Sequence, residues 1–252
     1  MKRFAAAAFL ALASSFAHAT SYSTDASDLW YIPAEDGWGL NISQQEATLF
    51  ATLFVYGTDG KPTWFVSSNL SPVAAGSTTF SGDLFATTGP AFAATWNPSL
   101  RTNRKVGTAT FAFDTVATAT FTYVVDNVTV TKHVVRQTWQ NDVISGSYAG
   151  VLAGVFSGCA ANGYGAVGQV FTITQANGTA VSITVNVDGS TSCKYDGTYV
   201  QTGHFGAIAA SGTCGSFQAQ EVHTTFAGIT MQVGQTFQGS CRLDGGVAGV
   251  RQ

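Results

Sequence analysis

The chain has 252 residues and a formal net charge of −3, and 45% of its residues are hydrophobic whereas 10% are charged. Soluble globular chains carry about 25% charged residues, so Ser, Thr, Asn, Gln and Gly must form much of the wetted surface here. This composition excludes an intrinsically disordered chain, and the lack of a basic cluster larger than Arg104-Lys105 excludes a nucleic-acid-binding protein.

Residues 1–19 have the pattern of a Sec-type signal peptide. Lys2-Arg3 precedes the apolar run 4–12, and the small-residue triplet Ala17-His18-Ala19 follows. Such segments are cleaved on export, which predicts a mature chain that begins at Thr20. No later run of about 18 apolar residues predicts a membrane span. We therefore expect a secreted or periplasmic protein.

Strand patterns dominate the mature chain. Trp38, Leu40 and Ile42 alternate with small or polar residues, and so do the apolar residues of 181–187. This period of two predicts strands with one buried face, and no window sustains the 3.6-residue period of a helix. Turn sequences separate the predicted strands, and examples are 58–62, 177–178 and 244–246. Their spacing is typical of sandwiches and barrels, so we expect antiparallel meanders.

Aromatic residues are concentrated in the first half. All five Trp lie there, and the predicted strand 49–56 is apolar on both faces. One face can fill a core, but the other needs a cover, which can be the second half of the chain, a partner chain or a ligand. Trp and Tyr combine a broad apolar face with a polar group. We therefore predict that a ligand would be bound by Tyr56, Trp64 and Trp96.

The second half contains the cysteines, which are Cys159, Cys193, Cys214 and Cys241. An even number in an exported chain indicates disulfides. Cys193 and Cys214 are equidistant from a predicted turn at Gly203-His204, so they would face each other across a hairpin. Cys159 and Cys241 would then join the first and last strands of a barrel. The other two of the three possible pairings stay open.

The two halves also resemble each other. The sequence 80–84 (Phe-Ser-Gly-Asp-Leu) has a counterpart in 195–199 (Tyr-Asp-Gly-Thr-Tyr), and the halves end in Val-Arg-Gln at 135–137 and 250–252. We interpret this as two diverged copies of one domain, although Gly-rich β-sequences can also match by chance.

The predicted fold is all-β, with two tandem up-and-down antiparallel β-barrel-like domains of about eight strands each. The Trp-rich domain is expected over 20–139 and the disulfide-braced domain over 140–252. Their mutual docking and the oligomeric state of the protein are left open by the sequence.

The first half resembles a domain that recurs in exported proteobacterial proteins. The resemblance is carried by Leu29-Trp30-Tyr31-Ile32-Pro33-Ala34-Glu35-Asp36-Gly37-Trp38-Gly39-Leu40, by the strand 49–56 and by Gly60-Lys61-Pro62-Thr63-Trp64. The signature of that domain is Trp-x-x-Pro-x-Glu-x-Gly-Trp-Gly, then a strand ending in Tyr, then Asp-Gly-x-Pro-x-Trp. The resemblance implies a β-architecture and export, and it implies no particular activity.

A looser resemblance is to the calycin barrels, which include lipocalins, avidins and small secreted protease inhibitors. In those barrels an aromatic residue on the first strand packs under an Arg on the last strand. Trp30 with Arg136, and Tyr148 with Arg251, occupy the corresponding positions. A guanidinium over an aromatic face is worth about 0.5–2 kcal/mol. The chain departs from the lipocalin Gly-x-Trp motif, because it has Asp28-Leu29-Trp30 and Gly146-Ser147-Tyr148 instead.

Catalytic motifs are absent from the sequence: it has no Gly-x-Ser-x-Gly, His-Glu-x-x-His, P-loop or calcium-loop pattern. His133, His204 and His223 lack a second ligand at metal spacing, so we expect no metal and no cofactor. Glu35 and Asp36 are adjacent and poorly placed for a catalytic pair, and Asp36-Gly37 is typical of a turn. We expect a protein that is not an enzyme.

The leading hypothesis is an exported, non-enzymatic binding protein that holds an extracellular glycan or protein segment on the aromatic residues of its first domain. One alternative is a calycin-type protease inhibitor that acts through an exposed N-terminal arm, 20–27. Another is a hydrolase of an extracellular polymer that uses Glu35, Asp36 or Glu221. An outer-membrane barrel is disfavoured, because the chain ends in Gln252 and its strands alternate irregularly.

Overall fold

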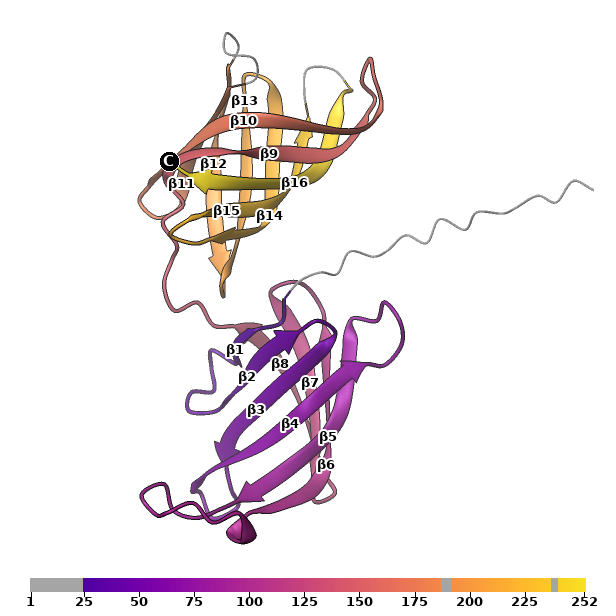
Figure 1. Ribbon diagram of the computed structural model, residues 1–252, viewed down its shortest axis with the longest axis vertical. Helices are drawn as coiled ribbons and strands as arrows, with labels where there is room; N and C mark the ends of the chain where they lie inside the picture. Colours follow the sequence, from indigo (N-terminus) through magenta and orange to yellow (C-terminus); the bar gives the residue numbers. More distant parts are fainter. Residues whose placement is uncertain (1–24, 187–191, 237–239) are drawn as a thin grey trace, which may run out of the picture.

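A computed structural model shows two closed antiparallel β-barrels in tandem, each with eight strands (Figure 1). It describes residues 25–186, 192–236 and 240–252, so the predicted signal peptide and its cleavage site lie outside the described residues. The all-β prediction is confirmed, since the described helical structure is a single 3-10 turn, η1, at Pro98–Leu100. No helix among the described residues has both the length and the apolar character needed to cross a bilayer.

The first barrel is a meander in which each strand pairs with the next and the last pairs with the first. Its strands are β1 Asp28–Tyr31, β2 Gly39–Gln45, β3 Thr48–Tyr56, β4 Pro62–Pro72, β5 Thr79–Thr88, β6 Thr102–Phe113, β7 Thr118–Val125 and β8 Val128–Arg136.

Alternation in β3 explains how the first core forms. Leu49, Ala51 and Leu53 point inward and are buried, whereas Phe50 and Tyr56 on the opposite face are exposed. Aromatic rings from β1 and β6 fill the same interior and pack edge to face, which is a geometry that their quadrupoles favour. Because side chains alternate along a strand, burial of the apolar inner side chains also fixes which side chains point outward.

The first barrel closes where Trp30 of β1 pairs with Arg136 of β8. The guanidinium carbon of Arg136 lies 4.5 Å from the centroid of the Trp30 ring, so the expected stacking is present. The Trp30 indole N–H donates to the carbonyl of Ala26 at 3.0 Å. Both side chains of the stacked pair are buried, so together they seal this end of the barrel.

The second barrel repeats the meander. Its strands are β9 Gly146–Ser157, β10 Gly163–Ala176, β11 Ala180–Asn186, β12 Ser192–Thr202, β13 Phe205–Gly212, β14 Gly215–Thr224, β15 Gly228–Thr236 and β16 Arg242–Arg251. It closes where Tyr148 of β9 pairs with Arg251 of β16, and the Arg251 guanidinium carbon lies 5.3 Å from the centroid of the Tyr148 ring.

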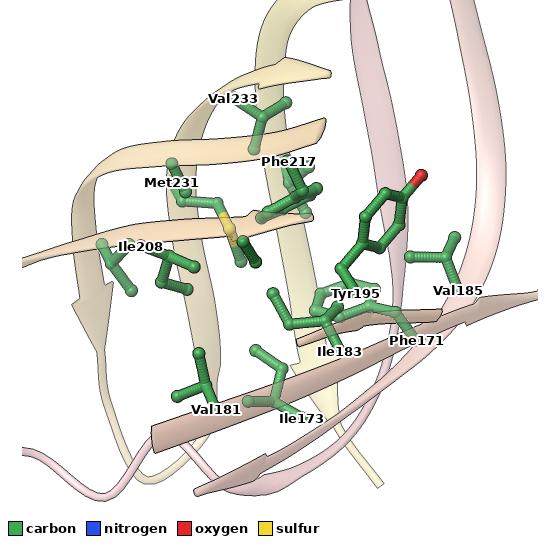
Figure 2. Packing of buried hydrophobic residues seen from close by; sticks show 14 of the residues in the cluster. Phe171, Ile173, Val181, Ile183, Val185, Tyr195, Ile208, Phe217, Met231 and Val233 are labelled. Atoms are coloured by element: carbon green, nitrogen blue, oxygen red, sulfur yellow. The ribbon is translucent and has the colours of Figure 1, made fainter. Parts of the chain in front are cut away.

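Side chains fill the interior of the second barrel, as Figure 2 shows for Tyr195, Phe217, Met231 and Val233. The space left between Phe171, Phe217 and Met231 measures about 10 Å³. Because one water molecule needs about that much room, this part of the interior is a packed core and not a ligand cup.

Two disulfides brace the second barrel. Cys193 bonds to Cys214, and Cys159 bonds to Cys241, which confirms the favoured pairing. Cys159 follows β9 and Cys241 precedes β16, so this bond joins the first and last strands of the barrel. Both bonds lie at the end of the barrel opposite the Tyr148–Arg251 pair.

Two details of the sequence reading are wrong. The matching segments 80–84 and 195–199 occupy β5 and β12, which are the fifth strand of one barrel and the fourth strand of the other. The predicted turn at 244–246 lies within β16. A Cβ added to Gly245 would overlap the backbone of β9, so this glycine serves close strand approach and not a turn.

The barrels meet through their sealed ends. The β12–β13 turn of the second barrel reaches the first, where the Nδ1 of His204 donates to Asp28 at 2.6 Å and the N–H of Gly203 donates to Thr138 at 2.9 Å. The guanidinium carbon of Arg136 lies 4.5 Å from the centroid of the Trp30 ring and 5.2 Å from the centroid of the Phe205 ring, so one cation contacts an aromatic ring of each barrel. The outer faces of both barrels are left open by this end-to-end contact (Figure 1).

Candidate functional site

The outer face of β3 and β4 carries a set of aromatic side chains. We call Phe50, Phe54, Tyr56 and Trp64 the aromatic strip. Phe54 pairs directly with Trp64 across β3 and β4, and Tyr56 pairs with Pro62. Tyr56 and Trp64 are therefore diagonal neighbours on one face, within reach of each other's side chains. Phe50 extends the strip along β3.

The second barrel leaves the aromatic strip uncovered. The exposed fractions of Phe50, Tyr56 and Trp64 are 45, 54 and 51% with both barrels in place. The possibility that the second half of the chain covers this face of β3 is therefore wrong. Large side chains with this much exposure, gathered on one face, are typical of an interaction site.

Glycines from the Trp-rich motif support the strip from below. A Cβ added to Gly39 would lie 2.6 Å from the ring of Phe54, and one added to Gly37 would lie 2.6 Å from the hydroxyl of Tyr56. Gly37 also has a φ of +98°, a backbone conformation that favours glycine. These two glycines let the rings lie close to the backbone of β2 and its preceding loop.

Polar residues flank the rings, and all but Glu46 are uncharged. Asn41 and Ser43 of β2 pair with Thr52 and Phe50 of β3, and they point to the same outer face. A surface groove of about 510 Å³ adjoins Phe50, and Ser43, Gln45, Thr48, Ser68 and Glu46 also line it. Apolar ring faces beside neutral hydrogen-bonding groups suit a ligand that is both polar and uncharged.

Trp96, the third predicted binding residue, lies in the loop between β5 and η1. Its side chain is 65% exposed, and its ring is 3.8 Å from a Cβ position at Gly89. Because β4 and β5 are antiparallel, this loop is at the end of the barrel where β3 ends and β4 begins. The structure thus brings Tyr56 and Trp64 together and places Trp96 at their end of the barrel.

A polar cluster at the same end was missed by the sequence reading. Glu35, in the loop between β1 and β2, accepts from Lys132 of β8 at 2.7 Å and from the indole N–H of Trp38 at 2.9 Å. Hydrogen bonding from Lys132 lowers the pKa of Glu35, while burial raises the pKa of the neighbouring Tyr123. β1 is short and pairs with β8 only at Arg136 and Val135. Beyond these pairs, the ion pair of Glu35 with Lys132 holds the β1–β2 loop against β8.

This cluster could not be found by considering Glu35 only with its neighbour Asp36. Its partner, Lys132, lies 97 positions later, and only the barrel closure brings the two together. The sequence did contain one signal for this cluster, which is the spacing of Glu35 and Trp38. A separation of three residues within a loop allows the indole N–H to donate to the carboxylate.

The histidines do not all stand alone, contrary to expectation. The rings of His204 and His223 are 5.8 Å apart, and His204 bonds to Asp28. His133 bonds to Thr120 through Nδ1 at 3.1 Å. Over residues 25–186, 192–236 and 240–252, no group of three or more His, Cys, Asp or Glu side chains is arranged to hold a metal ion.

Comparisons with protein-family models, curated proteins and solved structures give no match to the chain. The function is therefore inferred from the geometry of the molecule.

Proposed function

We propose that this is an exported binding protein whose first barrel holds a neutral glycan on the aromatic strip. The observation that carries the proposal is the exposure of Tyr56 and Trp64 on adjacent strands. Sugar rings present apolar C–H faces and hydroxyl edges, and aromatic faces bordered by amides and hydroxyls complement both. The two disulfides are typical of an oxidising compartment, which supports export.

A glycan suits this surface better than a peptide does. Extended peptides commonly bind by pairing with a free strand edge, but β3 is paired with β2 on one side and with β4 on the other. A ligand on the strip must therefore be held by side chains. Along β3, the strip from Phe50 to Tyr56 spans about 20 Å, because a strand rises about 3.3 Å per residue. That length accommodates several sugar units of an extended chain.

The described part of the N-terminal arm does not support the inhibitor hypothesis. Ala26 is buried, and its N–H donates to the side chain of Gln44 at 2.7 Å. The hydroxyl of Ser27 accepts from the N–H of Gln44, and the carbonyl of Asp25 accepts from Arg136. Residues 25–27 are thus held against the first barrel and are not free to enter a protease cleft.

Affinity electrophoresis of residues 20–252 tests the proposal. The gels contain one neutral polysaccharide each: a β-1,3-glucan, a β-1,4-glucan derivative, a xylan or a galactomannan. We expect at least one polymer to retard the protein, and Trp64→Ala to weaken that binding tenfold or more, which corresponds to about 1.4 kcal/mol.

Trp139→Ala is the matched control, because Trp139 is an exposed Trp outside the strip. This control should bind as the wild type does. Equal retardation of Trp64→Ala, Tyr56→Ala and wild type would show that the strip is not the site.

A further inference from the structure

A second hollowed surface lies on the outside of the second barrel. It consists of two adjoining grooves of about 620 and 390 Å³, which share Glu221 and Gln232. The larger groove is bordered by His204 and Phe205 at the junction with the first barrel, and the smaller one extends to Gln218 and Asp244. The volumes are those of ordinary ligand sites, and junctions between domains are common places for such sites.

Small residues form the floor of the surface and amides form one wall. In the β-sheet register, Gln220 of β14 lies beside Gln232 of β15, which lies beside Gly246 of β16. The next position across, on β9, is Ala153. Because Gly246 and Ala153 carry little or no side chain, the sheet surface is lowered beside two long amide side chains. This asymmetry makes the hollow.

Residues at the junction of the two barrels line one part of the larger groove. Asp28 of the first barrel accepts a hydrogen bond from Nδ1 of His204, which fixes the orientation of that imidazole. A β-bulge lies between Gln220 and His223 on β14, and bulges redirect the side chains around them. The result places the His223 ring 5.8 Å from the His204 ring, beside Phe205 at 6.3 Å.

We propose that this surface, which we call the amide groove, is a second glycan-binding site. Its amides and imidazoles both donate and accept hydrogen bonds, as sugar hydroxyls require, and Phe205 and the exposed Val151 add apolar area. Asp25 and Glu221 line the groove and would repel an anionic ligand, while Arg242 is already paired with Asp244 at 2.5 Å. An extended peptide has no free strand edge here, because β14, β15 and β16 are each paired on both sides.

The amide groove and the aromatic strip lie on different barrels that meet end to end, so one chain has two separate places to hold a polymer. Two linked sites raise the apparent affinity for a polymer without new contacts, whereas a short oligosaccharide gains nothing from the second site. The amide groove does not depend on the strip, and the two are tested independently.

The test uses the same four polysaccharide gels and four proteins: wild type, Trp64→Ala, the pair Gln220→Ala with Gln232→Ala, and all three substitutions together. Both glutamines are exposed, so their truncation should leave the fold intact, and circular dichroism checks this. Gln140→Ala is the matched control at an exposed glutamine outside the groove.

We expect Trp64→Ala to keep measurable retardation by at least one polysaccharide, and the added glutamine substitutions to remove it. Complete loss in Trp64→Ala, with normal binding by the glutamine pair, would overturn the amide groove and leave the strip intact. Complete loss in the glutamine pair, with normal binding by Trp64→Ala, would support the groove and overturn the strip. Absence of retardation in the wild type would overturn both.

Discussion

The carboxylate of Asp28 accepts hydrogen bonds from residues of both barrels. Arg136 of its own barrel donates at 2.8 Å, and His204 of the other barrel donates at 2.6 Å. The Arg136 side chain is fully buried and that of Asp28 is 6% exposed, so water competes little for these bonds. Closure of the first barrel and contact with the second therefore depend on one side chain.

The pH dependence of stability should reveal this carboxylate. Burial opposes the charged form of Asp28, but the hydrogen bonds from His204 and Arg136 outweigh it, so the pKa is lowered below 3.8. A lowered pKa in the folded state contributes stability that is present above the unfolded value and is lost as pH falls through the folded value. We expect Asp28→Asn to lower the melting temperature at pH 7, and the difference from wild type to shrink below about pH 4. A difference that stays constant from pH 7 to pH 2 would contradict this account.

Arg136→Ala should destabilise the first barrel more than Arg251→Ala destabilises the second. Its removal leaves Asp28 buried without its cationic partner, and breaking a buried ion pair on one side costs about 3–5 kcal/mol. Arg251 stacks on Tyr148 and donates to the carbonyl of Ser145, so its loss strands no buried carboxylate. Differential scanning calorimetry of both variants makes the comparison. An equal or larger effect of Arg251→Ala would show that the ion pair adds little.

Gly203→Ala should separate the barrels without unfolding either. Gly203 has a φ of +63°, and an added Cβ would overlap the Asp28 carboxylate and approach Arg136 Cβ to 2.9 Å. We expect faster proteolysis of the connecting segment 137–145 and a larger radius of gyration by small-angle X-ray scattering, with unchanged circular dichroism. Thr202→Ala, at the neighbouring position, is the control. Identical proteolysis of the Gly203 variant and wild type would mean that the turn does not hold the junction.

Reduction of the disulfides should destabilise one barrel only. The bonds close loops of 82 and 21 residues within the second barrel, and loops of this size contribute about 3–5 kcal/mol each in the chain-entropy account. In dithiothreitol, the calorimetric transition of the second barrel should move to lower temperature while that of the first stays in place. Movement of both transitions together would show that the barrels unfold as one cooperative unit.

Local sequence patterns were sufficient to predict much of the fold. The alternation along β2 and β3 identified strands and their buried faces, and the position of a predicted turn midway between Cys193 and Cys214 identified a disulfide. The stacking of Arg136 and Arg251 on first-strand aromatic residues was implied by the resemblance to calycin barrels, and the structure shows both contacts. The strand and disulfide inferences succeeded because each rests on neighbours along the chain or on the topology of a simple meander.

Other features depend on contacts that no local pattern encodes. The partner of Glu35 is Lys132, and the partner of Asp28 is His204, 176 positions later in the other barrel. Glycine was also ambiguous: Gly245 occupies a strand because β9 and β16 approach closely, although an Asp-Gly-Gly sequence is typical of a turn. Tyr56 and Trp64 could be selected as exposed aromatics, but their neutral polar border required the register of β2 against β3.

The central claim is that the aromatic strip binds a glycan. Fluorescence titration with a polysaccharide that retards the protein in affinity electrophoresis tests it most directly. Trp64→Phe keeps an aromatic ring for stacking but removes the emission of that indole. We predict that Trp64→Phe still binds but loses most of the ligand-induced fluorescence change, while Trp64→Ala loses the affinity itself and Trp139→Phe retains both. A fluorescence change that survives in Trp64→Phe and disappears in Trp139→Phe would place the ligand elsewhere and contradict the aromatic strip as the binding site.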